Sequence, residues 1–140
     1  MKVRQIMTEP VITVEPDASV EAAARMLTHY NIGMLPVCDS RGQMCGLVTD
    51  RDLVTRCVAS GRKPEQTKVR EVMTGQVLSV NVDMDAGVAA HFMGKQQVRR
   101  LPVTENGKLC GMLSLGDLAR REDAVMDAAD ALYDISNNIR

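Results

Sequence analysis

The sequence predicts a mixed α+β fold of two β-α-β-β-α units, packed through their sheets with pseudo-twofold symmetry. Two observations carry this prediction: the second half of the chain repeats the first, and in both halves the hydrophobic pattern alternates between strand-like and helix-like periods in the same order. The chain has 140 residues, of which 45% are hydrophobic. A unit of about 60 residues is marginal alone, so the two are expected to share their stability.

The repeat covers nearly the whole chain. The aligned pairs are IMTEPVITVEPD (6–17) with VMTGQVLSVNVD (72–83), IGMLPV (32–37) with VRRLPV (98–103), and MCGLVTDRDL (44–53) with LCGMLSLGDL (109–118). These alignments predict four parts, namely repeat 1 at 1–60, a linker at 61–68, repeat 2 at 69–121 and a C-terminal helical tail at 122–140. The linker is expected because its neighbourhood is polar and contains Gly and Pro.

Each repeat begins with a short β-branched strand and continues with a helix. The strands are VITV (11–14) and VLSV (77–80). Candidate N-caps follow them, at Asp17 or Ser19 in repeat 1 and at Asp83 or Asp85 in repeat 2. Apolar residues at helical spacing then predict an amphipathic helix after Ser19.

A hairpin and a second helix complete each repeat. The first hairpin strands contain Pro36 and Pro102, and proline predicts an edge position or a strand start. Asn106-Gly107 predicts a type I′ turn. The tail is acidic and amphipathic, and we expect it to dock on the module or on a partner subunit. Its apolar positions are Ala124, Ala128, Ala131, Leu132 and Ile135.

Composition argues against several classes of partner. The formal net charge is −1 and aromatic residues make up 2% of the chain, so neither a global basic field nor base-stacking platforms for nucleic acid are expected. No apolar stretch resembles a signal peptide or a membrane span, which predicts a cytoplasmic protein with no membrane partner.

The motifs of common enzymes and metal sites are missing from the sequence. No phosphate-binding loop, dinucleotide fingerprint, zinc-protease helix or nucleophile elbow is present, so we expect no catalytic activity. The four cysteines have no C-x-x-C spacing, and His29 and His91 have no partner at a fixed spacing. The sequence therefore predicts no metal site and four reduced cysteines, most of them buried.

One motif occurs twice, as GLVTDRDL (46–53) and GMLSLGDL (111–118). A hydroxyl followed three residues later by an acid is a helix N-terminus signature, which explains Thr49 with Asp52 and Ser114 with Asp117 structurally. The same residues also suit a ligand, because a helix N-terminus favours a phosphate and a carboxylate accepts hydrogen bonds from ribose hydroxyls. The motif glycines indicate a close approach by a ligand or by the other sheet.

The doubled motif, with LPV upstream of each copy, resembles the cystathionine β-synthase (CBS) domain family over residues 1 to 121. The resemblance implies β-α-β-β-α units that pair through their sheets and commonly dimerise into a disc of four CBS domains. It also implies adenosine-containing ligands in the clefts between units, and a regulatory rather than catalytic role.

The resemblance assigns roles to particular residues. It implies that Asp52 and Asp117 bind ribose, with Thr49 and Ser114 as the motif hydroxyls at the helix N-termini. The implied adenine pockets place Val77 and Leu78 opposite Asp52, and Val11 and Ile12 opposite Asp117. The implied phosphate-binding residues are Arg99, Arg100, Arg70 and Arg4.

The two clefts are not expected to be equal. Repeat 1 has Gly33 and Met34 where repeat 2 has Arg99 and Arg100, so we expect the Thr49/Asp52 cleft to bind nucleotide more tightly. The resulting hypothesis is a homodimeric sensor of AMP, ADP, ATP or a similar ligand that signals to an unidentified effector protein. A ligand-free interaction scaffold and a nucleic-acid-binding protein remain as alternatives.

Overall fold

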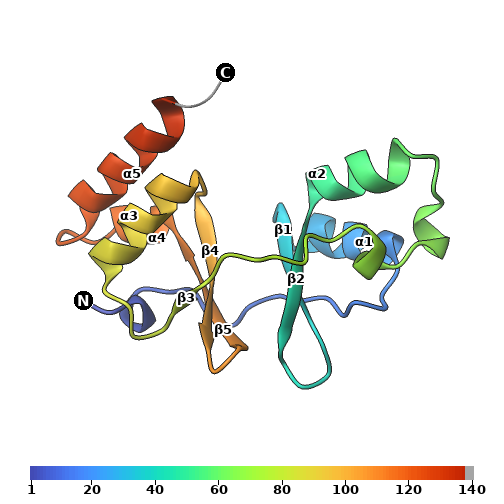
Figure 1. Cartoon of the computed structure of the whole chain (residues 1–140), viewed down its shortest axis with the longest axis horizontal. Helices are drawn as coiled ribbons and strands as arrows, with labels where there is room; N and C mark the ends of the chain where they lie inside the picture. Colours follow the sequence, from blue (N-terminus) through green and yellow to red (C-terminus); the bar gives the residue numbers. More distant parts are fainter. Residues whose placement is uncertain (138–140) are drawn as a thin grey trace. The chain divides into compact units, whose positions relative to one another are not determined.

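The computed structural model describes residues 1–137 and divides the chain into two compact units (Figure 1). The continuous unit is Ile12–Val77. The discontinuous unit joins Met1–Val11 to the chain from Leu78 onward. Residues 138–140 of the predicted tail lie outside the described residues.

The continuous unit contains a two-stranded antiparallel sheet. One helix precedes the two strands in the sequence, and the other helical segments follow them. Its main elements are α1 (Val20–Tyr30), β1 (Met34–Cys38), β2 (Met44–Thr49) and α2 (Asp50–Leu53), which runs into a π-helical turn, η2 (Val54–Val58). Two short 3-10 turns follow, η3 (Pro64–Gln66) and η4 (Val69–Glu71).

The discontinuous unit has a three-stranded sheet in the order β3-β4-β5. Its elements are η1 (Val3–Gln5), β3 (Val80–Asn81), α3 (Ala86–Gln96), β4 (Arg100–Glu105), β5 (Lys108–Ser114), α4 (Leu115–Ala119) and α5 (Val125–Asn137). The predicted mixed α+β class is therefore confirmed, with one small sheet in each unit.

Side-chain caps determine where the two long central helices begin. The Ala22 amide donates to Ser19 Oγ at 3.0 Å ahead of α1, and the Val88 amide donates to Asp85 Oδ2 at 3.2 Å ahead of α3. Each cap satisfies an amide that has no partner within the helix. Of the candidate caps, Ser19 and Asp85 are thus the ones used.

The two prolines of the hairpins differ in position. Pro36 lies in β1, an edge strand of the two-stranded sheet, as predicted, whereas the prediction was wrong for Pro102. Pro102 is the third residue of β4, which lies between β3 and β5. In repeat 1 the Val14 amide donates to the Pro36 carbonyl at 3.1 Å, so this carbonyl points toward the first strand. The Pro36 nitrogen points the same way and has no hydrogen to donate, and it lies just before the point where pairing with the first strand begins. This explains why the first strands shrink to a bridge at Val14 and to the two residues of β3.

The hairpin between β4 and β5 has the predicted turn. Asn106 and Gly107 have φ angles of 54° and 79°, the left-handed values that a type I′ turn requires at both central positions. The turn joins Glu105 to its partner Lys108 and fixes the register of the two strands.

The leading segments of the two repeats are exchanged between the units. We use this term for residues 1–11 and 67–77. Residues 1–11 pack with the body of repeat 2, where Thr8 and Met112 exchange backbone hydrogen bonds of 2.8 and 3.1 Å. Residues 67–77 pack with the body of repeat 1, where Thr74 and Leu47 do the same at 2.8 and 2.9 Å. Each compact unit therefore contains parts of both repeats.

The motif glycines lie where the leading segments cross the sheets. A Cβ on Gly46 would lie 2.7 Å from both Met73 Sδ and the Thr74 carbonyl oxygen. A Cβ on Gly111 would lie 2.6 Å from Met7 Sδ. The predicted close approach is confirmed, but the approaching group is a leading segment and not a ligand or the other sheet.

The C-terminal helix docks on its own unit, one of the two options left open by the sequence. Figure 1 shows α5 beside α3, and a Cβ on Gly94 of α3 would lie 3.0 Å from Ala131 Cα. The tail's alanines and Ile135 are buried as predicted, whereas Leu132 is 44% exposed and was wrongly assigned to the docking face.

The cysteines divide into two classes. Cys38 and Cys57 are buried, and burial raises the pKa of the Cys38 thiol to about 11. Cys45 and Cys110 are half-buried, so the expectation that most cysteines are buried holds for two of the four. All four thiols are free.

Alanine at either motif glycine should destabilise the fold. Gly46→Ala forces a methyl group against the Thr74 carbonyl, and we expect it to lower the free energy of unfolding by roughly 1–3 kcal/mol. Gly111→Ala presses mainly on the Met7 side chain, with the Thr8 carbonyl oxygen 3.1 Å away, so its loss should lie at the lower end of this range. Urea unfolding followed by circular dichroism measures this loss. Gly75→Ala is the matched control, because a Cβ there meets nothing within 4 Å; an equal loss in all three variants would contradict the crossing constraint.

Gly94→Ala should loosen the contact between α3 and α5. The added methyl group would press on the backbone at Ala131, so we expect a loss of roughly 1–3 kcal/mol and faster hydrogen exchange in α5. Gly116→Ala is the control, since its Cβ would have ordinary contacts at 3.5 Å within α4. Alanine in a helix favours that variant by up to about 1 kcal/mol. Unchanged exchange in α5 after Gly94→Ala would show that the close contact does not hold the helix.

Candidate functional site

The repeated motif forms the same reciprocal cap in both units. In the continuous unit the Asp52 amide donates to Thr49 Oγ1 at 3.1 Å, and the Thr49 amide donates to Asp52 Oδ2 at 3.0 Å. In the discontinuous unit Ser114 and Asp117 make the corresponding bonds at 3.0 and 2.9 Å. The structural interpretation of the motif is therefore confirmed. In both units the Asp carboxylate closes a capping box.

The second carboxylate oxygen distinguishes the two aspartates. Asp117 Oδ1 accepts hydrogen bonds from Arg120 at 2.5 Å and from the Thr8 hydroxyl at 3.3 Å, and its side chain is 6% exposed. Asp52 Oδ1 lies 3.7 Å from Arg56 Nη2, beyond hydrogen-bond distance, and its side chain is 14% exposed. Asp52 thus keeps more capacity to accept hydrogen bonds from a ligand.

The difference originates in the leading segments. Thr8 and Thr74 are equivalent in the repeat, but only the Thr8 hydroxyl donates to its motif aspartate. Arg56 Nη1 instead donates to the Thr74 hydroxyl at 3.3 Å and to the Val72 carbonyl at 2.9 Å. Thr8 therefore adds a hydrogen bond to Asp117, whereas the equivalent Thr74 adds none to Asp52.

These threonines and arginines were not among the predicted site residues. The sequence signal for the threonines was present, since Met7-Thr8 aligns with Met73-Thr74 in the repeat. Nothing in the alignment indicates that Arg56 and Arg120, at different positions of their helices, approach the two aspartates.

The predicted phosphate-binding residues Arg4 and Arg70 are engaged in ion pairs. Arg4 donates to Asp83 at 3.0 and 3.1 Å and to Glu105 at 3.2 Å. The hydrogen bond from Arg4 holds the pKa of the Asp83 carboxyl below its usual range, and the same contact raises the pKa of Arg4. Arg70 is paired with Asp17.

The two arginines differ in the number of carboxylates that hold them. Glu105 aligns with Asp39 in repeat 1, and Asp39 accepts hydrogen bonds from the Arg41 and Gln43 amides of its own hairpin instead. Arg70 therefore has one carboxylate partner where Arg4 has two, which makes it the more easily redirected cation. All of these groups are exposed, so each pair contributes little to stability.

The compact units sort the predicted site residues. The continuous unit holds Thr49, Asp52, Arg70, Val77 and Ile12, and the discontinuous unit holds Ser114, Asp117, Arg4, Val11, Leu78, Arg99 and Arg100. The predicted clefts join residues of both units, so the combinations of Asp52 with Leu78 and of Asp117 with Ile12 stay predictions.

Arg99 and Arg100 lie beside the second motif within their own unit. Arg100 pairs in register with Ser114, and the Arg99 carbonyl accepts from the Leu115 amide at 3.0 Å. Gly33 makes the same backbone bond to Asp50 in the continuous unit, also at 3.0 Å. The proposed reach of the two arginines toward the Thr49 helix joins different units and stays a prediction.

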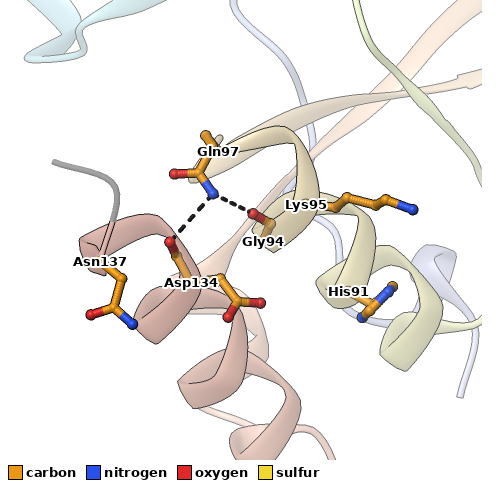
Figure 2. Close-up of a pocket in the computed structure, with 6 residues that line it drawn as sticks. All are labelled: His91, Gly94, Lys95, Gln97, Asp134 and Asn137. Carbon is orange, nitrogen blue, oxygen red and sulfur yellow. Dashed lines mark hydrogen bonds between the residues drawn. The ribbon is translucent and has the colours of Figure 1, made fainter.

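A cavity of about 490 Å³ lies between the end of α3 and α5 and contains no predicted site residue (Figure 2). Its lining residues are His91, Gly94, Lys95, Gln97, Asp134 and Asn137. Gln97 Nε2 donates to the Gly94 carbonyl at 2.8 Å and to the Asp134 carbonyl at 3.3 Å, as Figure 2 shows. This side chain ties the end of α3 to α5, which is a structural role.

Residues 1–137 contain neither a candidate metal centre nor a candidate membrane-spanning helix. Within this range no three His, Cys, Asp or Glu side chains gather closely enough to hold a metal ion. None of the helices described there has the length and apolar character needed to cross a bilayer.

The comparison with known families identifies the chain. The CBS domain family matches residues 3–59 and 69–124. The protein therefore belongs to the CBS domain family and carries two such domains in tandem, as the repeated motif predicts.

Two relatives are similar to the chain over nearly its full length. CBS domain-containing protein YhcV of Bacillus subtilis is 38% identical over 96% of this chain and 95% of its own. Hypoxic response protein 1 of Mycobacterium tuberculosis is 30% identical over 92% of both chains. A crystal structure of hypoxic response protein I with two coordinated zinc ions has a TM-score of 0.78, covering 86% of this chain and 98% of that one.

A second similar structure contains small-molecule ligands. The CBS domain pair of protein MJ0100, in complex with 5′-methylthioadenosine and S-adenosylmethionine, is 27% identical with a TM-score of 0.73. The match covers 86% of this chain and 94% of that one. Adenosine-containing ligands thus occur in a relative with the same arrangement of domains.

Removal of the two motif carboxylates should have unequal effects on stability. Both Asp52→Ala and Asp117→Ala lose the reciprocal cap, for about 1 kcal/mol each. Asp117→Ala also loses the hydrogen bonds from the Thr8 hydroxyl and Arg120, which adds up to about 1 kcal/mol because both donors are exposed and water can replace the acceptor. Urea unfolding of both variants tests the difference, with exposed Asp123→Ala as the control. Equal losses would show that the extra contacts of Asp117 contribute nothing.

Proposed function

We propose that this CBS pair is a non-catalytic regulatory module that binds an adenosine-containing ligand, such as AMP, ADP or ATP. The observation that carries the proposal is the state of Asp52, whose Oδ1 lies 3.7 Å from its nearest cationic partner beside a capped helix N-terminus. A carboxylate oxygen in this position accepts a ribose hydroxyl without displacing a protein hydrogen bond. The adenosine ligands of the MJ0100 pair support the same ligand class.

The proposed site assigns each residue one task. Asp52 accepts from the ribose, and the Thr49 helix end lies toward the phosphates. Arg70 exchanges Asp17 for a phosphate, assisted by Arg99 or Arg100, and Val77 and Leu78 contact the adenine. In the second site, formed with Val11 and Ile12, Ser114 and Asp117 take the corresponding places, but Asp117 and Arg4 are already engaged. The second site is therefore the weaker one.

Signalling follows from the location of the residues in two units. A ligand that contacts both units biases the equilibrium between their arrangements, and a homodimer transmits this shape to an effector protein. A ligand-free scaffold is the second candidate, because two of the four predicted phosphate-binding arginines, Arg4 and Arg70, are already paired with carboxylates.

Thermal unfolding with AMP, ADP, ATP, S-adenosylmethionine and a GMP control tests the proposal. A ligand at about 100 times its dissociation constant stabilises the folded state by about 2.7 kcal/mol, which raises the melting temperature by several degrees. Asp52→Asn preserves the shape and one acceptor oxygen of the carboxylate but replaces the other with a donor, so the shift should disappear.

Asp117→Asn is the matched control and should keep most of the shift. A shift that survives Asp52→Asn and disappears in Asp117→Asn would contradict the ranking of the two sites. No shift with any adenosine compound would favour the ligand-free scaffold.

A further inference from the structure

Helix α5 has an apolar face that its own unit does not cover. The face opposite the buried alanines contains Val125, Met126, Ala129, Leu132 and Tyr133, which we call the outer stripe. Met126 is 72% exposed and Tyr133 is 68% exposed. Asp127, Asp130 and Asp134 follow at helical spacing along one border of this stripe.

A groove on α1 is open at the place where α5 lies in the other repeat. On α3 the contacts with α5 involve Gly87 and Gly94, which align with Glu21 and Thr28 of α1. The α1 groove, a cavity of about 520 Å³, is lined by Glu21, Ala24, Arg25, Thr28 and His29. Among the described elements of repeat 1, the part that aligns with α5 is only the three-residue turn η3, which contacts α1.

The α1 groove is shaped for a different kind of contact than the one on α3. Gly87 and Gly94 let α5 approach α3 to within 3.1 and 3.0 Å of their ideal Cβ positions. The larger Glu21 and Thr28 keep a helix farther away and require larger side chains to fill the space. Met126 and Tyr133 of the outer stripe are such side chains, whereas the buried face of α5 offers alanines.

The two surfaces offer one complementary pair of charges, Arg25 in the groove and Asp130 on the border of the stripe, although Glu21 also lines the groove. Arg25 and His29 follow one another at a spacing of four residues on the α1 groove, and the Arg25 side chain is 79% exposed. Arg25 forms an ion pair with Glu21 of the same helix at 3.0 Å, and both side chains are exposed. Such a pair contributes little to stability, so Arg25 can exchange Glu21 for another carboxylate. The acidic border of the outer stripe supplies Asp130 as a partner.

We propose that α5 of a second copy of this chain docks with its outer stripe in the α1 groove, with Asp130 facing Arg25. In a twofold dimer the contact forms twice, since each copy offers one stripe and one groove. The inference rests on the homodimer of the proposed function but is independent of the nucleotide. It identifies the tail as the element that pairs the copies.

Sedimentation velocity over a range of protein concentrations tests the contact. The wild-type chain should dimerise, and Tyr133→Lys and Met126→Lys should each weaken the dimer at least about tenfold, as expected for large apolar side chains at an interface. Val88→Lys is the matched control, because Val88 is 56% exposed on α3 and outside both surfaces. It should leave the dimer intact.

A charge exchange tests which surfaces meet. Arg25→Glu should weaken the dimer by repulsion from Asp130, and adding Asp130→Arg should restore it. Circular dichroism and the thermal shift with adenosine ligands verify in each variant that the fold and the nucleotide site are intact, so a failed dimer and a failed ligand site are distinguishable.

Several outcomes would overturn the inference. They are a wild-type chain that is monomeric at every concentration, a dimer indifferent to Tyr133→Lys and Met126→Lys, and a charge-exchanged double variant no better than Arg25→Glu alone. Equal weakening by Val88→Lys would also overturn it, because the loss would then reflect added surface charge.

Discussion

The structure depends on the backbone pairing of each leading segment with the strand that carries the repeated motif. Thr74 pairs with Leu47 and Thr8 pairs with Met112, in each case beside a motif glycine whose missing Cβ leaves room for the crossing chain. The strand ends at the hydroxyl residue that starts the next helix. The crossing therefore determines both the sheet and the position of the motif carboxylate.

Nearly equal repeats acquire different properties through single side chains. The Thr8 hydroxyl reaches Asp117, whereas the Thr74 hydroxyl is taken by Arg56, so one carboxylate is complete and the other is not. Gly87 and Gly94 let α5 lie close to α3, whereas α1 has larger residues at these positions. One motif carboxylate is thereby completed by protein hydrogen bonds, and the other is the one that the proposed function assigns to a ligand.

Local patterns predicted most of the elements, because capping residues and turn residues act over a few positions. Thr49, Ser114 and the Asn106-Gly107 turn were predicted for this reason. The exchange of leading segments was not predictable from the alignment, since the alignment shows that Met7-Thr8 and Met73-Thr74 are alike but not which body each contacts. The acceptors and donors around Asp117 were missed because Thr8 lies 109 residues away.

The discontinuous unit also imposes an order on the growing chain. Proteins are synthesised from the N-terminus, and domains generally fold as units when their residues become available. The continuous unit has all its residues once Val77 has emerged, whereas Met1–Val11 then still lack β5 and α4. Residues 1–11 thus emerge well before the strand and helix they pack against, whereas the continuous unit can fold as soon as Val77 is available.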